Sequence, residues 1–192
     1  MIDITKHQLH TESVLGPLVD QFHSFERYSL VDIPAFVGAG VYALYLVDAT
    51  ATPYEGFVDC SRPIYVGKAV PEGSRQGRTV NTATSKLSAR IREHRRSIES
   101  VQLGAHRFEV RFAILTEQGL DLISALESAL IRKHTPLWNS YIDGFGNHDP
   151  GKGRYEQSIS EWDTLHVGRV WASRLTGVPP RLENILQKIE NY

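Results

Sequence analysis

A histidine and an arginine lie four residues apart in a stretch that predicts a helix over 85–99. Residues at this spacing lie on the same side of a helix, so the side chains of Arg90 and His94 should be neighbours. His94 falls within the apolar stripe of Leu87, Ile91 and Ile98, where a structural role in the core is more frequent than a catalytic one. Further arginines at positions 92, 95 and 96 favour contact between this helix and phosphate.

A carboxylate occupies an otherwise apolar helix predicted over 121–134, where Glu127 has Ile123 and Ile131 four residues away on either side. A buried carboxylate is costly unless it is paired or bound to a metal. A salt bridge to an arginine, an exposed helix edge and a metal site all stay open. A lone carboxylate suits Mg²⁺, whose other positions go to water and substrate phosphate. The sequence lacks the HExxH and Cys/His spacings of zinc sites, the P-loop and the GxSxG motif.

Segments rich in β-forming residues predict three strands, over 40–47, 63–67 and 107–115, with the first two antiparallel and joined by a long connection. Together with the two helices they give the order β-β-α-β-α across residues 38–140. Asp121 is expected to cap the second helix, and Pro136 prevents that helix from continuing.

Additional helices are expected at both ends of the chain, around 14–25, 159–175 and 180–190. The length of 192 residues favours one domain, 1–192, with a core over 38–140. No internal repeat or low-complexity tract interrupts it.

The single cysteine, Cys60, excludes a disulfide framework and favours a reducing, cytoplasmic setting. No signal peptide or membrane span is expected. The formal net charge of −1 conceals an uneven distribution: residues 62–111 carry 11 basic and 4 acidic side chains, whereas residues 1–61 carry 2 and 8. This asymmetry is typical of a surface facing a polyanion, although a solvated charged face would give the same count. Two long glycine-containing basic loops, 70–84 and 143–154, are candidate functional segments.

Two tyrosines in the first two predicted strands complete an ordered set along the chain: Gly40-Val-Tyr42, Tyr65-Val-Gly67, Arg90-x-x-x-His94, Glu127 and Asn139. In this order the set resembles the GIY-YIG nuclease superfamily. The segments 65–69, 87–94, 127–131, 136–139 and 143–148 are similar to its type II restriction endonuclease branch, and the resemblance covers about residues 35–172. The 22 residues between the two tyrosines are an insertion relative to many members.

The resemblance implies an α/β (α+β) fold, with a three-stranded antiparallel sheet flanked by helices and with N- and C-terminal additions. It also implies hydrolysis of a DNA phosphodiester with one divalent metal. Glu127 would bind Mg²⁺, for which Mn²⁺ could substitute. Arg90 would neutralise charge on the phosphoryl group, to which its fork of donors is suited.

The other site residues follow from the same resemblance. Tyr42 would act as the general base on the attacking water. A phenol with a pKa of about 10 needs a nearby cation to favour the phenolate, and Lys68 is the expected one. Tyr65 and His94 would orient the water or relay its proton, and Asn139 would fix the tyrosine or phosphate geometry.

DNA recognition is expected outside the catalytic core. Arginine most often reads guanine through O6 and N7, so a GC-rich site is one expectation. A palindromic site in double-stranded DNA favours a homodimer, with residues 1–37 and 141–192 embracing DNA or the partner subunit. A partner DNA methyltransferase is expected in the same system. The expected DNA-binding residues are Arg75, Arg78, Lys86, Arg92, Arg95, Arg96, Asn147, His148, Lys152 and Arg154.

Three alternatives stay open. A structure-specific or repair nuclease of the same superfamily would share the site but usually carries further domains. A homing endonuclease would typically add an elongated DNA-binding tail. A catalytically inactive DNA-binding module would keep the basic surface, and the complete set of candidate catalytic residues argues against it.

Overall fold

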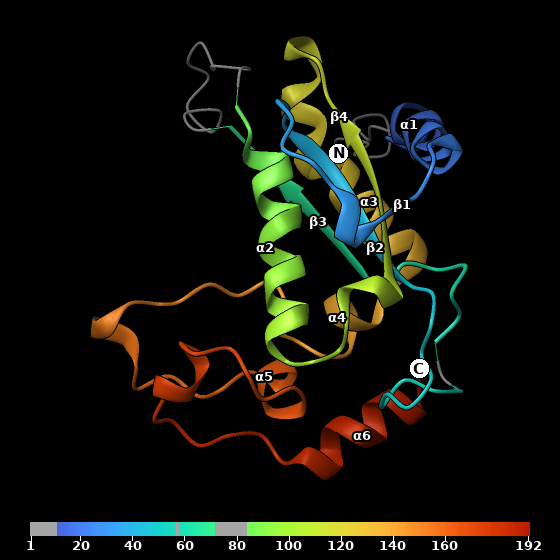
Figure 1. Ribbon diagram of the computed structural model, residues 1–192. Helices are drawn as coiled ribbons and strands as arrows, with labels where there is room; N and C mark the ends of the chain where they lie inside the picture. Colours follow the sequence, from blue (N-terminus) through green and yellow to red (C-terminus); the bar gives the residue numbers. More distant parts are fainter. Residues whose placement is uncertain (1–10, 57, 72–83) are drawn as a thin grey trace, which may run out of the picture.

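The computed structural model describes residues 11–56, 58–71 and 84–192 and contains a four-stranded antiparallel sheet (Figure 1). The strands lie in the order β1 (Tyr28–Ser29), β4 (Phe108–Ile114), β2 (Gly40–Leu46) and β3 (Tyr65–Ala69). Strand β2 therefore has a partner on each side, whereas β3 forms one edge of the sheet. This edge matters for the candidate active site, because a ligand at the edge can reach side chains on both faces of the sheet.

Helices cover both faces of the sheet (Figure 1). Helices α1 (Glu12–Ser24) and α3 (Ile123–His134) pack on the face to which the odd-numbered residues of β2 point. Helices α2 (Lys86–Ser100) and α4 (Leu137–Ser140) pack on the other face, with the even-numbered residues of β2. Because successive strand residues alternate between faces, a strand covered on both sides is apolar throughout, as β2 is.

The C-terminal segment lies beside the lower end of α2 and closes the core there (Figure 1). It contains α5 (Glu161–Leu165) and α6 (Leu182–Glu190). No helix in the described part of the chain is long and apolar enough to cross a membrane. Short 3-10 helices occupy Leu30–Asp32, Ala105–Arg107, Glu117–Leu122, Lys152–Arg154 and Ala172–Arg174.

The β-β-α-β-α order and the antiparallel pairing of the first two predicted strands are confirmed. The sheet has one strand more than expected, because the two residues of β1 pair with β4. The second predicted strand, expected over 63–67, forms two residues later as β3. The expected N-terminal helix around 14–25 forms as α1, and the last expected helix forms as α6.

Two local predictions are wrong. Asp121 does not cap the second core helix: a 3-10 helix occupies residues 117–122, so α3 begins at Ile123 without a side-chain cap. The helix expected over 159–175 is reduced to α5 and one 3-10 turn. In that region the side chain of Arg169 is buried and bonds to backbone carbonyls of the 144–147 segment, contacts that local periodicity does not encode.

The insertion between β2 and β3 contributes a buried anchor to the core. Tyr54 is fully buried, and its hydroxyl accepts a hydrogen bond of 2.9 Å from Trp138 Nε1. The same hydroxyl lies 2.5 Å from Nε2 of His166. These contacts tie the described part of the insertion to Trp138 of α4, which precedes Asn139, and to His166 at the end of α5.

Candidate active site

Strands β2 and β3 place two tyrosines on the same face of the sheet. In the register of the pair, Tyr42 is opposite Gly67 and Leu44 is opposite Tyr65, so the tyrosines are diagonal neighbours. Their ring centroids are 6.2 Å apart. A Cβ at Gly67 would lie 2.4 Å from the Tyr42 hydroxyl, so only glycine leaves room for that hydroxyl opposite Tyr42.

Helix α2 brings His94 to the first tyrosine. The apolar stripe predicted for this helix is buried, and His94 lies within it. The Tyr42 hydroxyl and His94 Nε2 are 2.6 Å apart, with both side chains almost completely buried. Burial lowers the pKa of His94 well below its usual 6.5, and the charge of Arg90 lowers it further. Burial also raises the pKa of Tyr42 well above 10. The result is a neutral phenol bonded to a neutral imidazole.

Arg90 lies beside this pair, as its spacing from His94 predicts. Its guanidinium donates to the Gly146 carbonyl (2.6 Å) and to a Glu93 carboxylate oxygen (2.7 Å). Glu93 also receives a contact of 2.8 Å from Nδ1 of His148, so it bridges two basic side chains. The positive charge of Arg90 opposes the effect of burial on the pKa of Tyr42.

Lys68 occupies a different place from the one expected. Side chains along β3 alternate between the two faces of the sheet, so Lys68 points to the α3 face and Tyr65 to the α2 face. Lys68 Nζ lies 2.7 Å from Glu127 Oε2, and Arg90 is the cation whose charge lowers the pKa of Tyr42. The expectation that Lys68 favours the Tyr42 phenolate is therefore corrected. The partner of Glu127 is this lysine and not an arginine.

Glu127 lies on α3, which packs on the face of the sheet opposite the one that carries the two tyrosines. Burial raises the pKa of Tyr65, and the negative charge of Glu127 raises it further. The side chain of Glu127 is 17% exposed and is paired with Lys68. No cluster of three or more acidic, histidine or cysteine side chains that could hold a metal occurs among the described residues. A single carboxylate such as that of Glu127 would fit a cation that takes most of its ligands from water and substrate.

Asn139 fixes the edge strand. Its side-chain oxygen accepts a hydrogen bond of 2.7 Å from the Val66 amide, and its side-chain nitrogen donates to the Val66 carbonyl over 2.9 Å. The amide side chain therefore continues the hydrogen bonding of the sheet where β3 has no strand partner. Because Val66 adjoins Tyr65, this contact fixes the backbone that carries the second tyrosine.

Most of this chain also matches the model of a known protein family. The Eco29kI GIY-YIG domain, a family of type II restriction endonucleases, matches residues 34–192. The chain belongs to this family. The protein is thus a nuclease, and membership implies that it binds DNA; GIY-YIG nucleases generally use divalent metals. A search of curated proteins gave no match.

The expected DNA-binding residues of this GIY-YIG domain fall into separate groups. Arg92 lies about half a turn around α2 from Arg90. Arg95, near it on the helix surface, donates to the Val31 carbonyl over 2.8 Å. Asn147, His148, Lys152 and Arg154 are exposed in the C-terminal segment. Lys86 and Arg96 complete the described set, whereas Arg75 and Arg78 lie outside the described residues.

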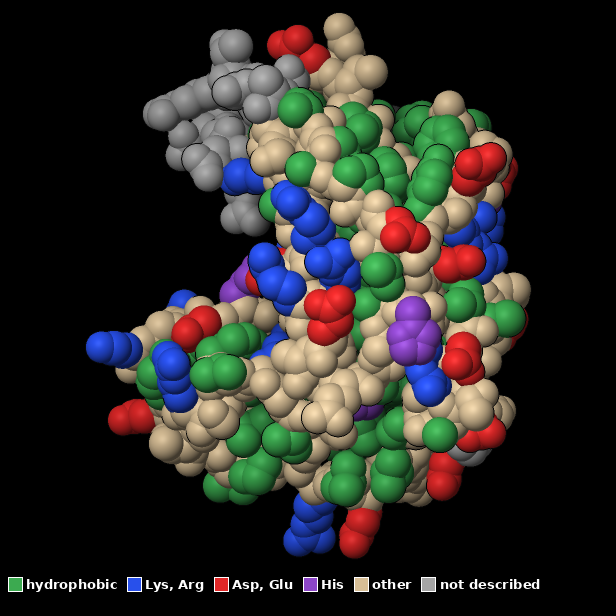
Figure 2. Space-filling model, viewed as in Figure 1, with side chains coloured by type: hydrophobic (Ala, Val, Ile, Leu, Met, Phe, Trp, Pro, Cys, Tyr) green, Lys and Arg blue, Asp and Glu red, His purple; other side chains and the backbone are tan. Residues whose placement is uncertain are grey.

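The surface on the α2 side is basic and concave. On the face shown in Figure 2, Lys and Arg side chains gather over α2, and the surface beside them is hollowed towards the C-terminal segment. A histidine lies in the hollow. On the face shown in Figure 2, this hollow among the described residues has a shape and charge that suit a DNA duplex.

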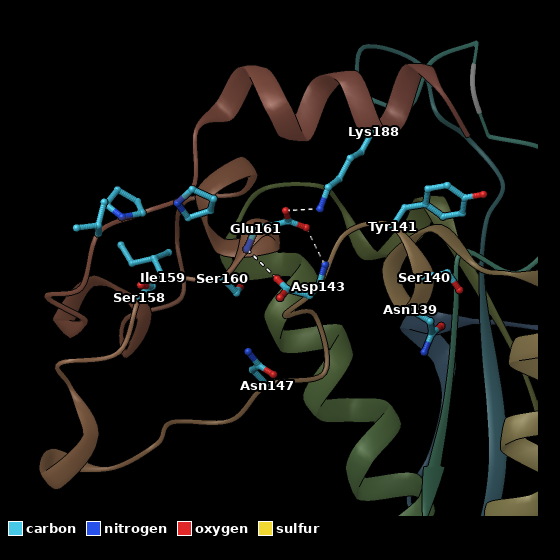
Figure 3. A pocket seen from close by; sticks show the side chains of 13 residues that line it. Asn139, Ser140, Tyr141, Asp143, Asn147, Ser158, Ile159, Ser160, Glu161 and Lys188 are labelled. Carbon is cyan, nitrogen blue, oxygen red and sulfur yellow. Dashed lines mark hydrogen bonds and ion pairs between the residues drawn. The ribbon is translucent and has the colours of Figure 1, made fainter.

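A polar cavity of about 600 Å³ lies behind α4, next to Asn139 (Figure 3). Lys188, the basic side chain in its lining, is paired with Glu161, which also contacts the amide of Asp143. The described lining therefore offers no free positive charge to a DNA phosphate. The cavity does not form part of the candidate active site.

Two residues of this site were missed by the sequence reasoning. Glu93 lies three residues after Arg90 on α2, a spacing at which opposite charges pair, so its role could have been found. Phe145 stacks on His94 with ring centroids 4.5 Å apart and contacts Tyr65 edge-on at 4.8 Å. No local pattern predicts this contact, because it joins a loop to a helix 51 positions earlier in the chain.

Proposed function

We propose that this protein is a type II restriction endonuclease that uses Mg²⁺ to cut both strands of double-stranded DNA at a specific, palindromic and GC-rich site. The observation that carries the proposal is the 2.6 Å contact between the Tyr42 hydroxyl and His94 Nε2, with Arg90 and Tyr65 beside it. Hydrolysis of a phosphodiester needs a proton acceptor for water and positive charge for the phosphoryl oxygens. This cluster contains both.

The proton acceptor is the Tyr42–His94 pair. A free phenolate at Tyr42 is disfavoured by burial, which raises the pKa of this phenol. When Tyr42 takes up a proton and passes its own to Nε2 of the neutral imidazole, no phenolate has to form. Burial and the charge of Arg90 lower the pKa of His94, so the imidazolium is a transient carrier that hands the proton on. Tyr42 is fully buried whereas Tyr65 is partly exposed, so Tyr65 relays the proton of the attacking water to Tyr42. This arrangement assigns the water contact to Tyr65 and the base function to the pair beneath it.

Arg90 binds the scissile phosphate. In the protein alone its guanidinium pairs with Glu93 while the Gly146 carbonyl holds its orientation. If a phosphate oxygen takes the place of the Glu93 carboxylate, Nη1 of Arg90 stays paired with a negative charge. Nη2 continues to donate to the Gly146 carbonyl. Charge-assisted contacts of this kind are shorter and stronger than neutral hydrogen bonds.

Glu127 is the residue that would hold the divalent metal. A divalent cation held there would supply positive charge that stabilises the phosphoryl group during cleavage. Lys68 holds the carboxylate of Glu127 in place, because the two side chains form an ion pair of 2.7 Å. Asn139 holds the backbone of β3 at Val66, between Tyr65 and Lys68.

Specific reading of DNA comes from the hollow beside α2 and from the exposed residues of the C-terminal segment. Two copies of the chain would be needed for a two-fold site, since each contributes one Tyr42–His94 cluster from its described residues. The enzyme would act in the cytoplasm together with a methyltransferase that protects the same sequence in host DNA.

The test is a digest of DNA of known sequence with Mg²⁺, followed by sequencing of the ends. Discrete ends at one repeated motif are expected. Ends distributed over all sequences, or confined to branched and damaged DNA, would instead identify a general, structure-specific or repair nuclease. Binding without cleavage would identify an inactive DNA-binding module. A Tyr42→Phe preparation made in the same way controls for contaminating nucleases.

A further inference from the structure

A buried ion pair lies in the C-terminal segment, outside the residues that carry the proposed chemistry. Arg169 Nε donates to Asp163 Oδ1 over 2.6 Å, and Nη2 donates to Oδ2 over 2.7 Å. The two residues are 5% and 4% exposed. Ser160 donates to the same carboxylate over 2.6 Å. Because replacing a buried pair by apolar residues is often neutral or stabilising, stability alone is weak grounds for its presence.

The remaining donors of Arg169 bind the backbone of one loop. Nη1 donates to the carbonyls of Phe145 (3.0 Å) and Asn147 (3.3 Å), and Nη2 donates to the Gly144 carbonyl (2.8 Å). The guanidinium also lies over the rings of Trp162 and Trp171, at 4.5 and 4.8 Å from their centroids. One side chain thus ties residues 144–147 to the body of the domain at three points.

The loop held in this way carries three contacts of the active site. Phe145 stacks on His94, the Gly146 carbonyl accepts from Arg90, and His148 contacts Glu93. The approach is close, since a Cβ at Gly146 would lie 2.6 Å from the Tyr65 hydroxyl. A small movement of the loop therefore alters the surroundings of His94, Arg90 and Tyr65 together.

We infer that Arg169 and Asp163 are positioning residues of the active site, which act by holding the 144–148 loop against His94 and Arg90. The catalytic consequence rests on the proposed nuclease function, whereas the positioning itself does not. The charge of Arg169 also contributes to the low pKa of His94, in addition to burial and Arg90. The match of the family to residue 192 agrees with a C-terminal segment that is part of the catalytic domain.

The decisive variant is Arg169→Lys, which keeps the positive charge but loses the planar fork that serves the carboxylate and three carbonyls at once. The control is Lys188→Met, which removes the nearby Lys188–Glu161 ion pair but leaves all contacts between Arg169 and the loop in place (Figure 3). The first readout is the NMR spectrum of the His94 ring, because stacking on Phe145 displaces its proton shifts. The second is single-turnover cleavage by protein shown to be folded by circular dichroism.

We expect Arg169→Lys to change the His94 ring shifts and their pH titration, and to slow cleavage on the order of 10- to 100-fold, as small misplacements in active sites do. Lys188→Met should leave both unchanged. Phe145→Leu removes the ring that the loop delivers, so it should reproduce the His94 change even if Arg169→Lys fails to fold. Unchanged His94 shifts in folded Arg169→Lys or in Phe145→Leu would overturn the inference. Absence of cleavage by the wild type would count against the proposed function alone, since the His94 readout needs no DNA.

Discussion

The hydroxyl of Tyr42 and Nε2 of His94 lie 2.6 Å apart and join the central strand β2 to helix α2 in the interior of the domain. Both groups are buried, and their pKa values move in opposite directions, with the pKa of the phenol raised and that of the imidazole lowered. Each is therefore neutral near pH 7, and a proton that reaches the imidazole is held there only transiently. A buried tyrosine hydroxyl usually has a hydrogen-bond partner, as that of Tyr54 has in His166, so a variant that removes the hydroxyl is needed to separate a catalytic from a packing role.

Replacing Tyr42 by Phe should abolish this function while leaving the fold intact. We expect single-turnover cleavage to fall at least about 100-fold, roughly 2.7 kcal/mol of barrier, because the hydroxyl that hands its proton to His94 is lost. Tyr65→Phe should be similarly damaging if Tyr65 relays the proton. Tyr45→Phe is the matched control, since Tyr45 is a buried tyrosine of the same strand on the opposite face. Cleavage by Tyr42→Phe within about tenfold of the control would show that Tyr42 serves in packing and that its hydroxyl is not catalytic.

Glu127→Gln should remove cleavage but not DNA binding. The amide keeps the shape of the side chain but loses the charge that would hold a divalent metal beside Lys68. Loss of this partly exposed ion pair should cost the fold about 1 kcal/mol or less. Cleavage is measured in Mg²⁺, and binding by fluorescence anisotropy in Ca²⁺, with Glu117→Gln as an exposed control nearby on the chain. Substantial Mg²⁺-dependent cleavage by Glu127→Gln would exclude Glu127 as the metal ligand.

The parts that were predictable from sequence are those governed by local periodicity. The stripe of α2 places His94 in the core beside Arg90. A salt bridge is one of the alternatives that the apolar surroundings of Glu127 leave open, and it forms with Lys68. The contacts that were missed join distant segments. Arg169 bonds to carbonyls 22 to 25 positions earlier, and a backbone acceptor leaves no trace in residue type. The helix predicted over 159–175 does not form in full for the same reason. Tertiary hydrogen bonds in this region override the helical pattern of the sequence.

Acid should destabilise the fold through His166. Burial lowers the pKa of this imidazole from 6.5 to about 4, with a further contribution from the charge of Arg169. The unfolded chain therefore takes up the proton first as pH falls, so stability is complete above pH 6.5 and is lost between pH 6.5 and about 4. The full difference corresponds to about 3 kcal/mol. Urea unfolding at several pH values should show a shallower acid loss for His166→Gln than for wild type, whereas His106→Gln, at an exposed position, should keep the wild-type slope. Parallel curves for all three proteins would rule out His166 as the source.

The species bound to a palindromic site should be a two-fold dimer. The described residues of one chain form one Tyr42–His94 cluster, which serves one scissile phosphate at a time, so simultaneous cutting of two strands requires two copies. Sedimentation with an oligonucleotide that carries the site, in Ca²⁺ to prevent cutting, should give two protein chains per duplex. A stable complex of one chain per duplex that still cuts both strands would contradict this and would favour sequential nicking by a monomer.

The salt dependence of the same complex tests which residues meet the backbone. Six phosphate contacts would lower affinity on the order of 10³-fold between 50 and 200 mM salt, because each neutralised phosphate releases counterions. The exposed Lys152 and Arg154 of the C-terminal segment should be among the contacts. Replacing both by Ala should reduce the slope of log affinity against log salt by about 2 per chain. Lys133→Ala is the control, since Lys133 lies on α3, on the face of the sheet opposite α2, and contacts Asp20. An equal reduction by the control would show a general loss of charge and no specific contact by the C-terminal segment.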